Sequence, residues 1–340
     1  MAISFPYPDP PAGRPLVHPV FLPFAGCPFR CVFCAQTRQT GTKEHPISHA
    51  IRQLEKELAA LARRHAAPRE LAFFGGTFTN LPQGQQLALI KAAAHYRTAG
   101  LVTKIRCSTR PDAIDMPLLT RLKDAGLDMV ELGIQSFSDT ALTAARRGYS
   151  GDCARDACRM VIRAGLRLGI QLMPGMPGGG AEEFAADMEH TVALTPEILR
   201  LYPCLVLEGT ELAEQWKRGA FMPWTLDQTL AHLASAVVLA WREGITVSRI
   251  GLAPEESLTA AVLAGPKHPA LGGRVKARAL ASVIAAERAR LPGAPRLLRL
   301  PRRARGMFWG HKKELAAWYA SIGVTPDKLR WWDNNCCELS

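Results

Sequence analysis

Three cysteines stand close together near the start of the chain. Cys27, Cys31 and Cys34 lie within the stretch GCPFRCVFC, at a spacing of C-x3-C-x2-C. Cysteine thiolates hold iron–sulfur clusters, and structural zinc also takes cysteine or histidine ligands. His18 and His45 flank the motif, so counting ligands alone leaves zinc open. We favour a four-iron cluster, because three cysteines would leave one iron with an open position, as catalytic metal sites have.

The motif follows the first of six short apolar segments that we expect to be β-strands. Amphipathic segments of helical periodicity lie between them. This alternation predicts an α/β fold with a parallel sheet and helical crossovers, in the form of a partial (β/α)6 barrel like that of triosephosphate isomerase. The six expected strands are 16–24, 71–74, 105–108, 129–134, 166–173 and 198–203.

Polar residues or glycines stand at the ends of most of these expected strands. The carboxyl ends of the strands form the active face of parallel barrels. We therefore expect these residues to meet the cysteines at one face of the sheet. They are Gly75, Gly76, Thr77, Ser108, Gln135 and Gln171.

Positive charge is concentrated in one part of the sequence. The net charge is +12, and residues 274–313 hold twelve Lys or Arg but a single acid, Glu287. A local basic patch indicates an anionic partner, with nucleic acid as the first candidate and an acidic membrane surface as the second. A solvated helix face followed by a basic tail is the alternative interpretation.

Changes in residue composition along the chain suggest that it has three parts. We expect residues 1–14 to be an irregular lead-in, 15–250 a core domain, and 251–340 a basic, mainly helical extension. The longest apolar run, 233–241, is too short to span a bilayer, and no signal peptide is evident. We therefore expect a cytoplasmic protein with reduced thiols and no membrane partner.

The other cysteines and one histidine have weaker signals. We expect Cys107, Cys153, Cys158 and Cys204 to behave as small buried apolar residues. The role of Cys336 and Cys337 stays open, and His268 is expected to serve packing rather than chemistry. These expectations rest on residue type and position alone.

The motifs together resemble the radical S-adenosylmethionine (SAM) superfamily, whose cysteine signature has an aromatic residue before the third cysteine, here Phe33. Within the superfamily the chain most resembles the catalytic subunit family of elongator and its short bacterial relatives. The resemblance runs from about 17 to 280 and includes FFGGTFTNLP (73–82), VELGIQSFSDTAL (130–142) and GIQLMPGMPGG (169–179). The acetyltransferase domain of the longer members finds no counterpart, so we expect the radical half alone.

The resemblance implies a cofactor pair and its chemistry. The three cysteines would hold a [4Fe–4S] cluster whose open iron binds the amino and carboxylate groups of SAM. An electron from a donor such as flavodoxin or ferredoxin would then cleave SAM to methionine and a 5′-deoxyadenosyl radical, which abstracts a hydrogen atom from the substrate. The cofactors carry the difficult chemistry and the protein orients them.

The resemblance also implies roles for individual residues. Phe33 would pack near the adenine, the backbone of Gly75, Gly76 and Thr77 would line the SAM amino group, and Gln135 and Gln171 would meet the ribose. Arg147 would pair with the SAM carboxylate, although Arg146 is an equally basic neighbour. Ser108 stands where related enzymes often have glutamate, so any contact there is uncharged. No catalytic acid or base is assigned.

Three functions follow from this resemblance as alternatives. The first is modification of transfer RNA, as in elongator-like enzymes, with the basic segment neutralising phosphates and Phe308 and Trp309 stacking on bases. The second is action on an acidic small molecule such as a tetrapyrrole, as in oxygen-independent coproporphyrinogen oxidase. The third is a non-catalytic iron–sulfur protein that binds RNA.

Overall fold

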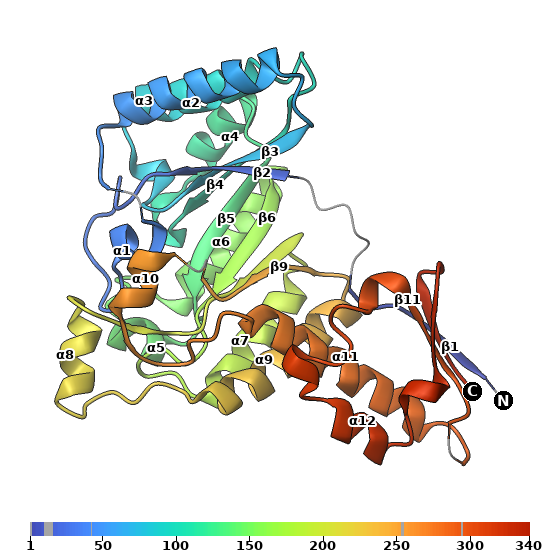
Figure 1. The fold of residues 1–340 in the computed structure, drawn as a ribbon. Helices are drawn as coiled ribbons and strands as arrows, with labels where there is room; N and C mark the ends of the chain where they lie inside the picture. The colour runs from blue at the N-terminus through green and yellow to red at the C-terminus, as the bar shows by residue number, and fades with distance from the viewer. Residues whose placement is uncertain (1, 10–15, 42, 253–254, 294) are drawn as a thin grey trace.

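A parallel sheet of seven strands forms the larger part of the protein (Figure 1). The computed structural model describes residues 2–9, 16–41, 43–252, 255–293 and 295–340. The strand order is β2-β3-β4-β5-β6-β7-β9, and every neighbouring pair is parallel. The strands are β2 (Leu16–Phe21), β3 (Arg69–Phe74), β4 (Val102–Thr109), β5 (Met129–Gln135), β6 (Arg167–Leu172), β7 (Ile198–Leu201) and β9 (Thr246–Ile250).

The expected α/β half-barrel is confirmed, with one strand more than the six that were predicted. The additional strand, β9, pairs in parallel with β7 at the edge of the sheet. Its sequence TVSRI has no continuous apolar run, and only Val247 within it is buried. A half-buried edge strand of this kind lacks the apolar signal that identified the other six.

Helices connect successive strands and cover the outer face of the sheet. Several begin at side-chain caps, such as Asp115, Ser138 and Ser150, which accept hydrogen bonds from backbone N–H groups of the first turn. The helices are α1 (Gln36–Thr40), α2 (Ile47–Arg63), α3 (Gln83–Ala94), α4 (Met116–Asp124), α5 (Asp139–Ala144), α6 (Gly151–Arg163), α7 (Ala181–Ala193), α8 (Glu211–Lys217), α9 (Leu226–Arg242), α10 (Glu256–Ala261), α11 (Leu271–Ala289) and α12 (Ala316–Ser321).

The two faces of the sheet have different surroundings because side chains alternate along each strand. On β3, Leu71 and Phe73 belong to the main apolar core under the helices. Glu70 and Phe74, on the same strand, line a cavity on the other face. The inner face is therefore the one that can hold a ligand.

A second, smaller sheet of four strands lies beside the half-barrel, with β1 in blue and the other strands toward the red end of the colour scale in Figure 1. Its order is β1-β13-β11-β12, from β1 (Ile3–Pro6), β11 (Leu298–Pro301), β12 (Leu329–Trp332) and β13 (Cys336–Leu339). β1 pairs with β13, so part of the lead-in that was expected to be irregular is a strand. Residues 10–14 of that lead-in lie outside the described residues. A further short pair is β8 (Val206–Leu207) with β10 (Val262–Ala264).

The small sheet has its own apolar core. Phe308 and Tyr319 are both fully buried there, and their rings stack with centroids 4.1 Å apart. The expectation that Phe308 stacks on bases is therefore wrong, since its ring fills the core beneath the sheet. Trp309 is partly buried against the same core, and Trp318 is 37% exposed.

Helix α11 joins the two parts of the chain. Val275 near its start belongs to the core of the half-barrel, whereas Leu280 and Ile284 belong to the core of the small sheet. The division of the chain at residue 250 stays a prediction. Among the described residues, the structure has no helix with the length and apolar character that a membrane crossing requires.

Candidate active site

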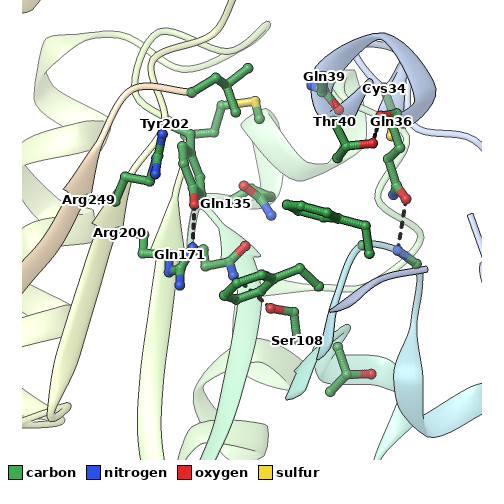
Figure 2. A pocket seen from close by; sticks show the side chains of 18 of the residues that line it. Cys34, Gln36, Gln39, Thr40, Ser108, Gln135, Gln171, Arg200, Tyr202 and Arg249 are labelled. Carbon is green, nitrogen blue, oxygen red and sulfur yellow. Dashed lines mark hydrogen bonds between the residues drawn. The ribbon is translucent and has the colours of Figure 1, made fainter. Parts of the chain in front are cut away.

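A cavity of about 880 Å³ runs along the inner face of the half-barrel. Each of the seven strands of the large sheet contributes side chains to it. Figure 2 shows Arg200, Tyr202 and Arg249 on one wall, with Cys34, Gln36 and Thr40 across the space. The residues predicted from the sequence that line it are Cys27, Cys31, Phe33, Cys34, Gly75, Gly76, Ser108, Gln135, Arg147 and Gln171.

The three motif cysteines face this cavity from the loop between β2 and α1. The Cys34 backbone N–H donates to the Cys31 carbonyl at 3.0 Å, which folds the loop into a turn. Burial raises the pKa of the Cys34 thiol to about 12, and the neighbouring thiols Cys31 and Cys27 add to the rise. Burial also raises the pKa of Cys27. The three sulfurs thus share one partly buried space.

The histidines that left zinc open do not reach this space. His18 lies on the other face of β2, where its Nε2 is 2.9 Å from Glu57 Oε2 of α2. The ring of His45 packs against His49, with centroids 5.0 Å apart. Within the described ranges, no three His, Cys, Asp or Glu side chains form a group that could hold a single metal ion, as a zinc site would require. The cysteines therefore face the cavity without either histidine.

Arg147 reaches the cysteine loop from the turn after α5. Its Nη1 donates to Cys31 Sγ at 3.0 Å, its Nε to Tyr149 Oη at 2.9 Å, and its Nη2 to the Gly133 carbonyl at 2.7 Å. Burial lowers the pKa of Arg147, but its interactions with Tyr149 and Cys31 more than offset this, so the net shift is upward. Arg146, in contrast, is 66% exposed and lies 3.6 Å from Glu211.

The glycine turn after β3 packs backbone against backbone on the cysteine loop. Gly76 has φ +61°, and a Cβ there would lie 2.1 Å from the Ala25 carbonyl oxygen. Only glycine fits such an approach. Thr77 is fully buried and lies behind the cavity wall, with its hydroxyl 3.4 Å from Cys27 Sγ. It contacts the cysteine, whereas the sequence suggested contact with a bound ligand.

Gln36 was missed in the sequence and has a central place in the structure. Its Oε1 accepts hydrogen bonds from Phe24 N at 2.6 Å and from Gly76 N at 2.8 Å. It therefore joins the cysteine loop to the glycine turn, and it lines the cavity. The feature of the sequence that could have indicated a role for Gln36 was its position two residues after Cys34.

Gln135, at the end of β5, has an unusual backbone conformation. Its φ is +69°, a left-handed value that costs a residue with a side chain roughly 1–3 kcal/mol. The side chain is 9% exposed, and its Oε1 has no hydrogen-bond partner among the described residues. A buried acceptor that faces a cavity is available to a ligand (Figure 2).

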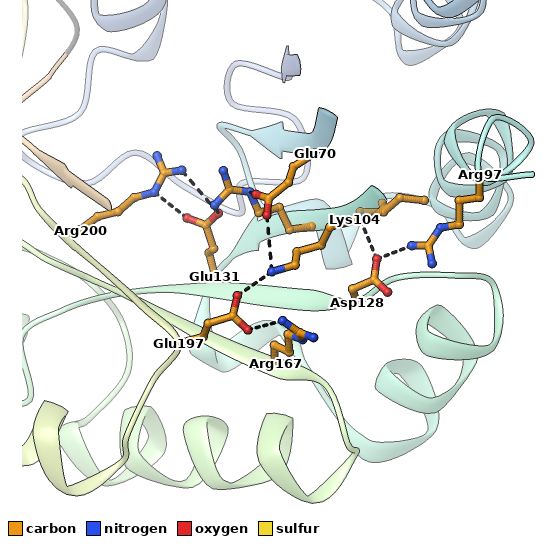
Figure 3. Close-up of polar contacts among 10 residues, drawn as sticks. Glu70, Arg97, Lys104, Asp128, Glu131, Arg167, Glu197 and Arg200 are labelled. Carbon is orange, nitrogen blue, oxygen red and sulfur yellow. Dashed lines mark hydrogen bonds and ion pairs between the residues drawn. The ribbon is translucent and has the colours of Figure 1, made fainter. Parts of the chain in front are cut away.

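The floor of the cavity is a network of buried and partly buried charges (Figure 3). Glu131, 1% exposed, lies 3.0 Å from Arg106 and 2.8 Å from Arg200. Lys104 lies 2.5 Å from Glu197 and 3.4 Å from Glu70. This network was not predictable from residue spacing, because its members come from four different strands and from the loop before β7.

Gln171 and Ser108 meet on this floor although 63 positions separate them. Gln171 Nε2 donates to Ser108 Oγ at 3.1 Å and to Glu131 Oε2 at 3.3 Å. Strands β4 and β6 flank β5, so their inward side chains converge above Glu131. Both residues line the cavity, as expected for strand-end positions.

The remaining cysteines and His268 lie away from the cavity. Cys107, Cys158 and Cys204 are buried as expected, whereas Cys153 is partly exposed on α6, so that expectation is wrong for it. Cys336 and Cys337 lie on β13, and Cys337 is buried in the small core. His268 Nδ1 accepts from Ala270 N at 3.0 Å and its ring packs on His311, a local packing role.

The fold and the site match a known family. Residues 21–191 match the radical SAM superfamily, and residues 196–280 match the radical SAM C-terminal domain. The chain belongs to the radical SAM superfamily and is a radical SAM enzyme. Enzymes of this superfamily use a [4Fe–4S] cluster and S-adenosylmethionine.

Relatives with curated names are similar over part of their length. Two are named tRNA uridine(34) acetyltransferase: that of Methanocaldococcus infernus is 33% identical over 147 residues, covering 42% of this chain and 27% of the relative. That of Dehalococcoides mccartyi is 29% identical over 257 residues, covering 66% and 56%. Protein YhcC of Escherichia coli is 28% identical over 172 residues, covering 49% and 55%. The chain thus spans about half of these relatives or less.

Two solved structures share the fold. Archaeal Elp3 of Methanocaldococcus infernus with an N-terminal deletion has a TM-score of 0.61 at 24% identity, covering 80% of this chain and 63% of that one. Coproporphyrinogen III oxidase from Escherichia coli has a TM-score of 0.50 at 23% identity, covering 70% and 54%. At these identities the likeness establishes the fold alone.

Proposed function

We propose that this radical SAM enzyme modifies transfer RNA. Relatives named tRNA uridine(34) acetyltransferase support the substrate class, with identities of 33% and 29%. The observation that carries the proposal is the placement of positive charge. Lys104, Arg106, Arg110 and Arg200 in the cavity pair with carboxylates. Arg305, Lys312 and Lys313 of the extension are exposed, where a large polyanion can reach them.

The cavity residues fit the cofactors of the superfamily. We assign Cys27, Cys31 and Cys34 to the cluster, which with SAM supplies the removal of a hydrogen atom from a substrate. The supporting observation is the Arg147 hydrogen bond to Cys31, since donors to ligating sulfurs are typical of such sites. Gln135 Oε1 has no hydrogen-bond partner among the described residues, so it can accept one from a bound SAM. Gly75 has no side chain, so a ligand can come close to its backbone there.

The charge pairing inside the cavity weighs against an acidic small molecule. Lys104, Arg106 and Arg200 pair with the floor carboxylates, and Arg110 lies 2.8 Å from Asp112. A tetrapyrrole with several carboxylates would have to displace these partners, and a buried charge left without its partner is costly. We therefore place this substrate second.

The exposed cations define a narrower surface than the whole basic segment. Arg274 lies 2.6 Å from Glu314, and Lys276 lies 2.7 Å from Asp9, so both have partners. Arg305, Lys312 and Lys313 are exposed to solvent. Trp318 on α12 is 37% exposed, so its ring is an aromatic surface on which a base can stack.

Binding of transfer RNA at several salt concentrations tests this surface. We expect R305Q/K312Q/K313Q to weaken binding and to reduce the slope of log affinity against log salt by about two to three, one ion per lost phosphate contact. Substitutions are preferable to deletion of 296–313, because Leu298 and Leu300 belong to the small core. An unchanged slope would remove this surface from the proposal.

A matched control is available on α2, at the opposite end of the molecule (Figure 1). R52Q/K56Q/R63Q removes three exposed cations there and should leave the slope nearly unchanged. In cells, mass spectrometry of transfer RNA nucleosides with and without the gene tests the reaction itself. A missing nucleoside with a rising precursor supports RNA modification, and an unchanged profile in cells that express the protein contradicts it.

A further inference from the structure

The segment after β5 turns sharply to bring Gln135 into the cavity. The pairing of β5 with β6 shifts in register between Leu132 and Gln135, and Gln135 takes its left-handed φ there. The Met173 N–H donates to the Gln135 carbonyl at 2.8 Å, which anchors one side of the turn. A conformation with this strain persists only where surrounding contacts impose it.

Asp187 of α7 supplies the anchor on the other side. Its Oδ1 accepts a hydrogen bond from the Phe137 backbone N–H at 2.6 Å, and its carboxylate also bonds the Ser136 side chain. Asp187 is 5% exposed and comes from an element 50 positions away along the chain. It therefore holds the two residues that directly follow Gln135.

We infer that Asp187 is a positioning residue for SAM: by fixing Ser136 and Phe137 it keeps Gln135 in the left-handed conformation that directs its amide into the cavity. The inference rests on the proposed role of Gln135 in binding SAM. Asp187 does not line the main cavity, so it acts through Gln135 rather than by touching the cofactor. No motif in the sequence identified it.

The surroundings of Asp187 make this anchor sensitive to pH. Burial raises the pKa of Asp187 to about 6, although the hydrogen bonds from Phe137 and Ser136 lower it and Glu183 on the same helix raises it further. His190, also on α7, packs its ring on Phe137 from the exposed side. No ion pair joins Asp187 to a cation in the described parts of the chain. Protonation would weaken a charge-assisted anchor to an ordinary one.

The test is SAM binding by the cluster-loaded protein, with iron content measured in parallel. At pH 7.5 we expect D187A to raise the Kd for SAM about tenfold and D187N about threefold, because asparagine keeps a neutral acceptor for Phe137 N–H. The wild type should lose about threefold in affinity as the pH falls from 7.5 to 5.5, and D187N should lose none of it. D156N, an exposed carboxylate on α6, should follow the wild type at each pH.

The outcomes separate the inference from the assignments on which it rests. If D187A does not fold, the pH profile of D187N decides alone. Equal affinities of the wild type, D187A and D187N, or equal pH profiles of the wild type and D187N, would overturn the positioning role. If the wild type itself binds no SAM, the cofactor assignment fails instead. A wild type that binds SAM but no RNA would leave this inference intact and contradict the proposed substrate.

Discussion

Arg147 donates a hydrogen bond to Cys31 across 3.0 Å, although 116 positions separate the two residues. The contact joins the turn after α5 to the cysteine loop after β2. Its guanidinium is held on the other side by Tyr149 and by the Gly133 carbonyl. Arg147 thereby contacts a proposed cluster ligand, and it also lines the cavity that we propose binds SAM.

Replacement of Arg147 by glutamine should make the cluster harder to reduce. A positive donor beside a ligating sulfur stabilises the more negative, reduced state, so its loss lowers the reduction potential. An anaerobic redox titration followed by electron paramagnetic resonance measures this. R146Q, which removes an exposed cation one residue earlier, is the control and should keep the wild-type potential. Equal potentials for R147Q and the wild type would show that the hydrogen bond does not tune the cluster.

Replacement of Cys31 by alanine should abolish both the cluster and SAM cleavage. A four-iron cluster held by three protein thiolates has no replacement ligand at this position. Iron content and the visible absorption of anaerobically reconstituted protein measure the loss. C158A removes a buried thiol on α6, away from the cavity, and should retain wild-type iron. Full iron in C31A would contradict the assignment of the cysteines.

Replacement of Gly76 by alanine should destabilise the protein by about 2 kcal/mol or more. The left-handed φ and the contact of the new Cβ with the Ala25 carbonyl both oppose the substitution. Thermal or urea unfolding measures the change. G84A on α3 meets nothing within 4 Å and should instead stabilise by up to about 1 kcal/mol. Similar results for the two variants would contradict the packing of the glycine turn.

Replacement of Glu131 by glutamine should lower the free energy of unfolding by about 3 kcal/mol. Arg106 and Arg200 would lose the carboxylate that both contact, and a buried charge without its partner is strongly unfavourable. Urea unfolding at neutral pH measures the change. D156N breaks an exposed pair on α6 and should cause no measurable change. If E131Q has the same free energy of unfolding as the wild type, the two arginines must find other partners.

Replacement of Asp187 by asparagine should change how stability depends on pH. The pKa of Asp187 is raised to about 6 in the fold from an ordinary 3.8, so the folded protein favours the protonated form more than the unfolded chain does. That stabilisation is fully present below the unfolded pKa and is lost as the pH rises through about 6. The free energy of unfolding of the wild type should therefore fall with rising pH, and that of D187N should not. The difference, D187N minus wild type, should rise by on the order of 2 kcal/mol between pH 4 and 8. A constant difference across this range would contradict the buried, ionised carboxylate.

Much of the candidate site was predictable because its signals are local. The cysteine motif and the glycines after β3 each consist of a few residues that are close together in the sequence. Such motifs can be recognised without the structure. Strands β2 to β7 also contain the short apolar segments that identified them. Gln36 and Asp187 were not predictable, since each acts by accepting hydrogen bonds from distant backbone groups that no local pattern specifies.

The basic segment illustrates the limit of composition. Its net charge is a property of the sequence, but whether a cation is free depends on its neighbours in space. Arg274 finds Glu314 forty positions away, and Phe308 turns into the core, whereas Lys312 stays exposed. The surface available to RNA is therefore smaller than the charged segment suggests.

The sequence alone determined the family, the cysteine motif and the α/β order of elements, because these depend on residue types and short spacings. Only the tertiary structure decided that Arg147 rather than Arg146 faces the cysteines, that β1 pairs with β13, and that the cavity floor is a balanced network of charges. Such features arise where strands distant in the chain pair and direct their side chains into one space. Their energies depend on burial and on partners, which chain order does not contain.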